Sequence, residues 1–219
     1  MIICLIYFNT NIASIILIIF RILKILKINN NIQYLSKKEN NTMKNSAAQS
    51  AVTQNINMLN KLHMAMIELY KGDSRRIQHF CKVHSYARLI AQMENVDYKT
   101  LFIIETAALT HDIGIHTCEE KYGECGGRLQ EKEGPALAKE LLERLGFETD
   151  ISERVQYLIA HHHTYSNIDG IDYQILVEAD FLVNMYEDGV SKGAVLKAYN
   201  NIFKTKYGKY ICKDMFLID

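Results

Sequence analysis

The feature that most limits the fold of this chain is the spacing of its apolar residues after residue 46. Apolar side chains recur there every three or four positions, as in Leu59, Leu62, Met66 and Leu69, which is typical of one buried face of a helix. No run of alternating β-branched residues competes with this pattern. The chain holds one proline and 11 glycines, all from Gly72 onward, too few turn residues for an all-β barrel or sandwich. The sequence therefore predicts an all-α fold, a compact helical bundle.

Capping and turn residues divide this pattern into seven expected helices. The first helix ends at Gly72, the second is capped by Asp73 or Ser74, and the third is capped by Asp97. A loop from Thr117 to Gln130 precedes the fourth, which has Pro135 in its first turn and Gly146 after its end. The fifth begins at Asp150 or Ser152, the sixth runs from about Ile171 to Glu187, and Ser191 caps a seventh through Phe203. We therefore expect a leading helix within residues 43–72, a helical domain over 73–205 and a C-terminal tail over 206–219.

Residues 1–42 form a hydrophobic, Asn-rich leader that differs from the rest of the chain. This segment contains 12 Ile and 7 Asn but no Gly, Val, Asp, His or Pro. One interpretation is a membrane anchor, because the mostly apolar stretch 2–20 is followed by Arg21, Lys24 and Lys27, which would place the domain in the cytoplasm. The favoured interpretation is A/T-rich sequence read in frame before a start at Met43, and a third is an amphipathic surface helix. None of them alters the chemistry, which lies after residue 72.

Charge and cysteine content narrow the class of protein further. Lys and Arg number 25 and Asp and Glu number 25, so no net positive charge favours binding of a nucleic-acid polymer. The five cysteines are odd in number and never form a C-x-x-C pair. They are Cys4, Cys81, Cys118, Cys125 and Cys212. We expect free thiols in a reducing, cytoplasmic compartment, with membrane contact only if residues 1–42 are an anchor.

Histidine and aspartate side chains interrupt the apolar faces of several expected helices. They are His79, His111, Asp112, His161, His162 and Asp180. Imidazole nitrogens combined with carboxylate oxygens suit a divalent first-row ion such as Mn, Co, Zn or Fe, while Mg is a further candidate. His63 and His84 are expected at the surface or behind the ligands, and His163 at the rim of the site.

The motifs around these residues resemble those of the HD-domain superfamily of metal-dependent phosphohydrolases over about residues 74–187. The motifs are H-x-x-x-V from His79, A-A-L-T-H-D-I-G from Ala107, E-G-P-A-L-A-K-E-L-L from Glu133, V-x-x-L-x-x-H-H from Val155 and E-A-D from Glu178. The resemblance implies an HD-domain-like helical bundle in which four residues hold one metal ion. These four are His79, His111, Asp112 and Asp180. His161 and His162 match the histidines that hold a second ion in the dinuclear branch.

Two positions depart from the family pattern. Gln130 stands where dinuclear members usually place another histidine, with Glu131 and Glu133 as the nearby substitutes, and Ile115 stands where some relatives carry a catalytic Glu or Lys. We therefore expect one tightly held ion and a weaker second one.

The resemblance implies hydrolysis of a phosphate ester of a nucleotide or another small phosphorylated metabolite. Asp112 or Asp180 would orient or deprotonate the water, and a histidine among His116, His161 and His162 would protonate the leaving oxygen. The candidate phosphate-binding cations are Arg75, Arg76, Lys82, Lys121 and Arg128. The alternatives are a catalytically weak nucleotide-sensing module and an HD-type di-iron oxygenase, and a homo-oligomer is compatible with each of them.

Overall fold

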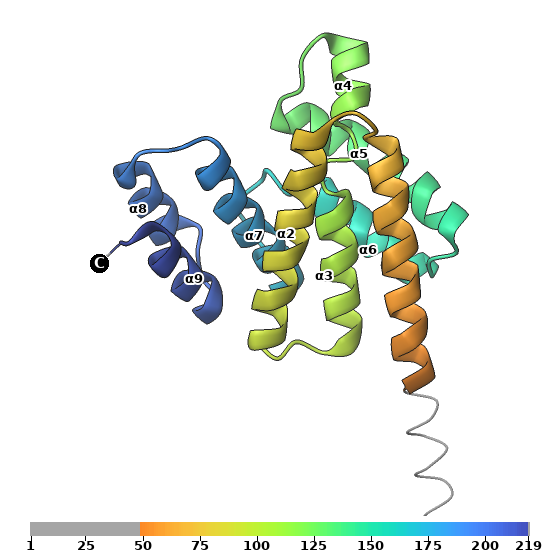
Figure 1. Ribbon diagram of the computed structural model, residues 1–219, viewed down its shortest axis with the longest axis horizontal. Coiled ribbons are helices and arrows are strands. Elements are labelled where there is room, and N and C mark those ends of the chain that lie inside the picture. Colours follow the sequence, from red (N-terminus) through yellow and green to blue (C-terminus); the bar gives the residue numbers. More distant parts are fainter. Residues whose placement is uncertain (1–48, 219) are drawn as a thin grey trace, which may run out of the picture. The chain divides into compact units, whose positions relative to one another are not determined.

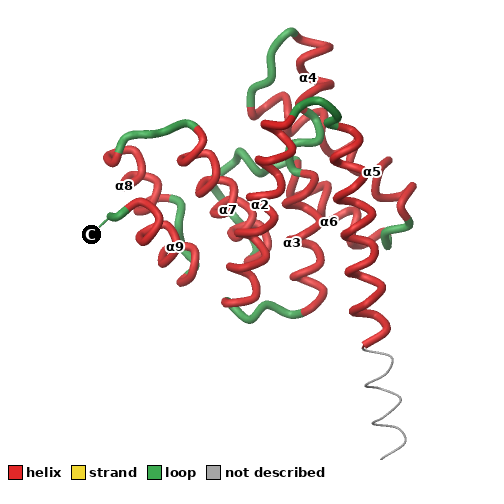
Figure 2. Tube along the Cα trace, in the orientation of Figure 1, coloured by secondary structure: helices red, strands yellow, loops and turns green. Residues whose placement is uncertain are grey.

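A computed structural model describes residues 49–218, and every regular element in that range is a helix (Figure 2). The all-α prediction is confirmed. The three interpretations of residues 1–42 concern a segment that lies outside the described residues. None of the described helices combines the length and apolar character needed to cross a membrane.

Residues 49–69 are helical, and their part from residue 55 onward, called the leading helix below, belongs to the compact unit Asn55–Asp219. The helices that follow are α2 (Ser74–Met93), α3 (Tyr98–Thr110), α4 (Ile115–Tyr122), α5 (Gly127–Leu145), α6 (Thr149–Ile159), α7 (Ile171–Glu187), α8 (Lys192–Asn201) and α9 (Lys206–Phe216). Helix α2 packs against α3 and α7, and α3 also contacts α6 and α7 (Figure 1). Helix α5 packs on α6, and α8 pairs with α9. The candidate ligands lie in the interior, near the start of α2, at the end of α3 and in the middle of α7.

Most of the expected helix ends are observed. The side chain of Asp73 accepts a hydrogen bond from the backbone of Arg76 at the start of α2, and Asp97 and Ser191 cap α3 and α8 in the same way. Gly146 ends α5 in the left-handed conformation, with φ of 82°. The expected range of the sixth helix, 171–187, is that of α7. These ends follow from local chemistry, because each cap satisfies backbone groups that the helix leaves unpaired.

Four expectations about the helices were wrong. The expected loop from Thr117 is α4 up to residue 122, which buries only Ile115 and Cys118 and so carries too short an apolar pattern to be recognised. Pro135 lies inside α5, which begins at Gly127, rather than in a first turn. Helix α6 begins at Thr149, one residue before the earliest expected start. In the leading helix Leu69 is exposed and Tyr70 is the buried residue.

The expected C-terminal tail, 206–219, contains α9. The carboxylate of Glu178 on α7 is fully buried and accepts hydrogen bonds from the backbone of Lys204 (2.5 Å) and Thr205 (2.9 Å) and from the Thr205 hydroxyl. Gly208 lies against this carboxylate, where a Cβ atom would collide with it. The glutamate of the E-A-D motif thus attaches α9 to α7.

Candidate metal centre

Four side chains from three helices converge at one point in the interior. His79 comes from α2, His111 and Asp112 follow α3, and Asp180 comes from α7. His79 Nε2 lies 3.3 Å from His111 Nε2 and 3.2 Å from Asp180 Oδ1. Asp112 Oδ2 lies 3.5 Å from the Nε2 atoms of both histidines, and His111 Nε2 lies 3.6 Å from Asp180 Oδ1. The four residues expected to hold the first ion therefore meet through one atom each.

The outer nitrogen of each imidazole is held by a separate partner. His111 Nδ1 lies 3.0 Å from the carbonyl of Ala108, to which it donates. His79 Nδ1 lies 3.0 Å from Glu187 Oε2, and the other oxygen of this carboxylate, Oε1, accepts from Lys82 at 2.7 Å. When Nδ1 donates outward, Nε2 keeps its lone pair for an ion, and a carboxylate behind a ligating histidine raises its basicity. Both imidazoles are thus oriented as ligands.

The aspartates give the group of four donors His79, His111, Asp112 and Asp180, called the nest below, a negative electrostatic potential. Burial alone would lower the pKa of His111, but the nearby carboxylates of Asp112 and Asp180 raise it to about 9. Burial would likewise raise the pKa of Asp112, yet His111 and His162 hold it at about 2. The pKa of Asp180 also falls, because its hydrogen bonds to His111 and His79 outweigh its burial. Two ionised carboxylates in a buried site favour a cation between them.

The residues present fit a divalent metal ion. In a tetrahedral site, ligands about 2.1 Å from the ion lie about 3.4 Å apart. The five separations that involve His79 Nε2 or His111 Nε2, 3.2 to 3.6 Å, bracket that value. Two nitrogen and two oxygen donors are the mixture that first-row divalent ions accept.

A second group of potential ligands adjoins the first. It consists of Asp112, His162 and His163, whose donor atoms lie within 4.8 Å of one another. His162 Nε2 is 3.6 Å from Asp112 Oδ1, so this aspartate faces the first group with one oxygen and the second group with the other. Gln130 Oε1 lies 3.3 Å from His162 Nε2 and 2.9 Å from His163 Nε2. The Gln130 amide oxygen thus lies beside the second group, at the position where dinuclear members of the family usually place a histidine.

The structure places His163, rather than His161, beside His162 in the second group. Helix α6 ends at Ile159, and the following turn directs His162 and His163 inward. His161 instead places Nδ1 2.7 Å from the carbonyl of Tyr157 and packs on that ring at 4.4 Å. His163, which was expected at the rim of the site, replaces His161 as the ligand candidate beside His162. Its ring fits because Gly127 has no side chain, since a Cβ atom there would lie 2.7 Å from the ring.

Neither expected substitute for the missing histidine faces the second group. Glu131 accepts hydrogen bonds from the backbone of His163 (3.0 Å) and the Thr164 hydroxyl (2.9 Å), and so it fixes the turn after α6. Glu133 is bound to Lys121 at 2.5 Å and to the Tyr122 hydroxyl at 2.8 Å. The second group therefore has fewer strong donors than the first.

A cavity of about 370 Å³ opens onto both groups. Its wall includes Arg75, Arg76, Ile115, Cys125 and Asn184 besides the ligand candidates. Arg76 is held at 2.5 Å by both Asp73 and Glu119, whereas Arg75 is largely exposed. Two of the expected cations therefore line the cavity.

The other expected binding and catalytic residues lie elsewhere. Lys82 and Lys121 are paired with Glu187 and Glu133, and neither they nor Arg128 line the cavity. His116 lies 3.3 Å from Asp73 and packs on the Tyr70 ring at 4.4 Å, outside the cavity lining. The structure therefore does not bring these residues to the cavity, and Lys82, Lys121 and His116 face partners on neighbouring elements instead.

Sequence reasoning missed several residues that support the ligands. The Asn184 amide donates to Asp180 Oδ1 at 2.9 Å, and the Tyr70 hydroxyl donates to the carbonyl of Asp112 at 2.6 Å. Asn184 and Glu187 follow Asp180 by four and seven positions, so helical spacing alone would have placed both on the ligand face. Tyr70 carries no comparable signal, because it acts across helices.

Comparison of the sequence with models of known protein families identifies one matching domain. The model of the HD domain matches residues 76–196, more than half of the 219-residue chain. The chain belongs to the HD domain family. The matched range contains all the ligand candidates of both groups, and it ends before α9.

Two solved structures share this HD-domain fold. One is a predicted HD superfamily hydrolase from an uncultured Thermotogales bacterium, with 24% identity, 72% of this chain and 84% of that chain covered, and a TM-score of 0.54. The other is YpgQ from Bacillus subtilis, with 16% identity, coverage of 74% and 88%, and a TM-score of 0.51. No curated protein matches the chain. At these identities the two structures support the HD-domain fold alone.

Proposed function

We propose that this HD-domain chain is a metal-dependent phosphohydrolase that cleaves a phosphate ester of a nucleotide or another small phosphorylated metabolite. The observation that carries the proposal is the nest of four donor atoms at a cavity that also exposes Arg75 and Arg76. Its volume of about 370 Å³ lies within the range of small-molecule sites. Guanidinium groups bind phosphate oxygens through paired N–H donors.

A divalent ion bound in the nest supplies Lewis acidity toward a phosphoryl oxygen and makes hydroxide available near neutral pH. The chain's own residues prepare the site for this chemistry. Asp112 is ionised at neutral pH and can accept a proton or a hydrogen bond from water in the cavity. Burial, aided by the charge of His162, lowers the pKa of His163 to about 4, so its imidazole is neutral at pH 7.

The leaving oxygen would be met by cations rather than by a histidine acid. His116 and His161 are absent from the cavity lining, and the histidines that do line it, His79 and His163, are ligand candidates. Arg76 is held in place by two carboxylates, so it is positioned in advance for negative charge on a phosphate or leaving group. Arg75 can approach from the exposed side.

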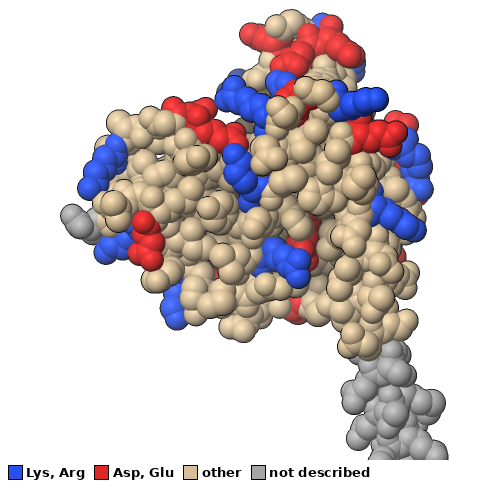
Figure 3. All heavy atoms as spheres, viewed as in Figure 1, with Lys and Arg blue, Asp and Glu red and all other residues tan. Residues whose placement is uncertain are grey.

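A small substrate is favoured over a nucleic-acid polymer. On the face drawn in Figure 3, Lys and Arg lie scattered among Asp and Glu rather than forming one basic area. A polymer would need a continuous track of cations along its backbone. The di-iron alternative would need a complete second site, which the Gln130 amide does not favour.

A phosphate-release screen tests the proposal. Purified protein is incubated with Mn, Co, Mg or Zn and a panel of nucleotides and small phosphate esters. We expect metal-dependent release of phosphate from at least one substrate. Asp112→Ala should reduce it by a factor of about 100 or more, because this residue contacts both ligand groups.

The neighbouring histidines provide a matched pair of variants. His162→Asn should lose most of the activity, whereas His161→Asn should keep it, because the His161 ring faces Tyr157. Activity that survives Asp112→Ala, or equal loss in both histidine variants, would contradict the proposal.

A further inference from the structure

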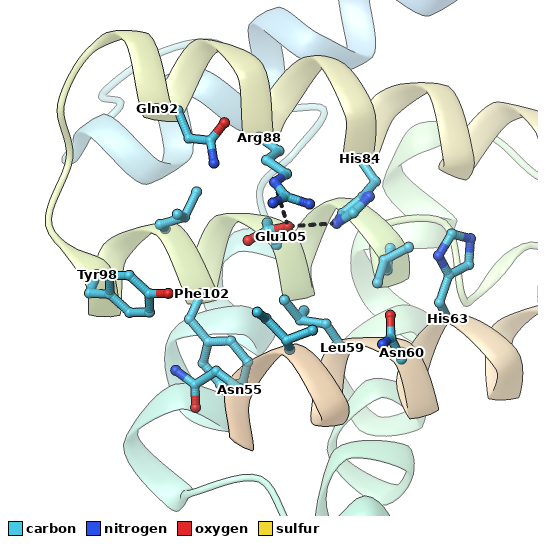
Figure 4. A pocket seen from close by; sticks show the side chains of 13 residues that line it. Asn55, Leu59, Asn60, His63, His84, Arg88, Gln92, Tyr98, Phe102 and Glu105 are labelled. Atoms are coloured by element: carbon cyan, nitrogen blue, oxygen red, sulfur yellow. Dashed lines mark hydrogen bonds and ion pairs between the residues drawn. The ribbon is translucent and has the colours of Figure 1, made fainter. Parts of the chain in front are cut away.

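A second cavity lies between the leading helix, α2 and α3. Its volume is about 150 Å³, and it is separate from the metal centre (Figure 4). His84 lines this cavity five residues after His79, which turns it about 140° away from the ligand face of α2. Leu59, Leu101, Phe102 and Leu109 form the apolar part of the lining.

A buried carboxylate provides the polar end of this cavity. Glu105 is 6% exposed, and its Oε1 atom lies 3.0 Å from His84 Nε2 and 3.6 Å from Arg88 Nε. The Oε2 atom has no hydrogen-bond partner among residues 49–218. In that range, every side-chain N or O atom that is fully enclosed does have a partner, so Oε2 is not fully enclosed. Oε2 must therefore face open space, and Figure 4 shows it pointing away from His84, toward the side where Tyr98 lies. A ligand N–H could complete its bonding.

The charges of the lining disfavour a cationic ligand. The Arg88 guanidinium already lies beside the Glu105 carboxylate, so the two charges nearly cancel. His63, in the same lining, has a pKa lowered by burial and by His84, which favours its neutral form. A neutral ligand with hydrogen-bonding groups therefore suits the cavity better than an amine.

Size and edge chemistry define the ligand further. A cavity of about 150 Å³ lined by apolar side chains holds one benzene-sized ring in an engineered protein, so a six-membered ring can be enclosed here, and the rest of a purine or a ribose would extend past the exposed Asn60. The Arg88 donors beside the Glu105 acceptor match a group with a carbonyl next to a ring N–H, which is a lactam. The amides of Asn60 and Gln92 supply further donors and acceptors in the lining.

We propose that this cavity binds a lactam-type nucleobase, such as uracil or hypoxanthine, as the base or nucleoside. The ring N–H donates to Glu105 Oε2, and the adjacent carbonyl accepts from the Arg88 guanidinium. The ring itself lies against Leu59 and Phe102. This site does not depend on the metal centre or on the reaction proposed for it.

Calorimetric titration of the full chain with uridine, inosine and adenosine tests the site. Adenosine is the matched probe, because its ring carries an acceptor nitrogen where inosine carries N–H. We expect uridine or inosine to bind one per chain and at least about tenfold more tightly than adenosine, since adenosine leaves the Glu105 acceptor opposite another acceptor. Absence of binding at about 10 mM, or equal affinity for adenosine, would overturn the proposal.

Three variants locate the binding. Asn60→Trp fills the cavity mouth and should weaken binding by about tenfold or more, whereas Asn57→Trp, exposed on the same helix and outside the lining, should not. Asp112→Ala disables the metal centre and should leave binding unchanged. Binding that survives Asn60→Trp, or that disappears in Asp112→Ala, would place the nucleoside elsewhere and refute the site.

Discussion

Gly127→Ala offers a local test of the second ligand group. An added Cβ atom would lie 2.7 Å from His163 Cγ, whereas ordinary contacts begin at 3.4 Å, so the ring must retreat by about 0.7 Å. The contact of 2.9 Å between His163 Nε2 and Gln130 Oε1 would then be broken. Displacements beyond about 0.5 Å spoil a ligand constellation. We expect the affinity for a second metal equivalent to fall by about 10- to 100-fold.

Gly126→Ala is the matched control. Gly126 adopts an extended backbone with φ of −97°, and nothing lies within 4 Å of the position of its Cβ. Titration of both variants with Mn, after the tight ion is loaded, measures the second equivalent separately. The reasoning would be refuted if Gly127→Ala bound the second equivalent as the wild type does, or if it lost the tight ion instead.

Three further predictions concern stability and domain limits. Burial raises the pKa of Asp73, but the hydrogen bonds that its carboxylate accepts from Arg76 outweigh burial and lower the pKa from 3.8 to about 2. Asp73→Asn should therefore lower the free energy of unfolding by about 1 kcal/mol above pH 4. In urea unfolding, this difference should shrink as the pH falls toward 2; a constant difference would contradict it. Gly208→Ala should destabilise the fold by about 1–3 kcal/mol through its collision with Glu178, whereas Gly193→Ala, with open space around it, should not; equal melting temperatures would contradict this. The chain 43–219 should fold and retain the tight ion, because every ligand lies between residues 79 and 180; loss of folding, seen by circular dichroism, would show that the leader is structural.

The sequence was sufficient for the parts of the fold that depend on local signals. Helix spacing and caps such as Asp97 and Ser191 set the ends of α3 and α8, because a cap bonds to backbone within the same turn. Helix α9 was missed although Thr205 caps its first turn by accepting from the backbone of Gly208, which is a local signal. Only its attachment to α7, through the bonds between Glu178 and Thr205, is long-range.

The candidate site shows the same division. His79, His111, Asp112 and Asp180 each interrupt an apolar helical face, and the structure brings them together. His161 was expected beside His162 because V-x-x-L-x-x-H-H matches the family motif, but α6 ends at Ile159, and the following turn brings His163 rather than His161 into the second group.

Two lysines that were expected to bind phosphate do not line the cavity, because carboxylates on other helices pair with them. Lys82 and Lys121 are positively charged near the motifs, but Glu187 and Glu133 bind them first. Sequence alone does not rank such partners, because the pairs join residues on different helices. The preference of Glu131 for the backbone of His163 has the same origin.

Metal content is the most direct test of the proposed centre. Wild-type protein, His111→Ala and His161→Ala are loaded with Mn or Zn, dialysed extensively and analysed by plasma mass spectrometry, with circular dichroism to monitor folding. We predict about one retained ion per chain in the wild type and in His161→Ala, and essentially none in His111→Ala, with the same helical signal in all three. A full equivalent of metal in folded His111→Ala would show that the ion is held elsewhere and would contradict the assignment.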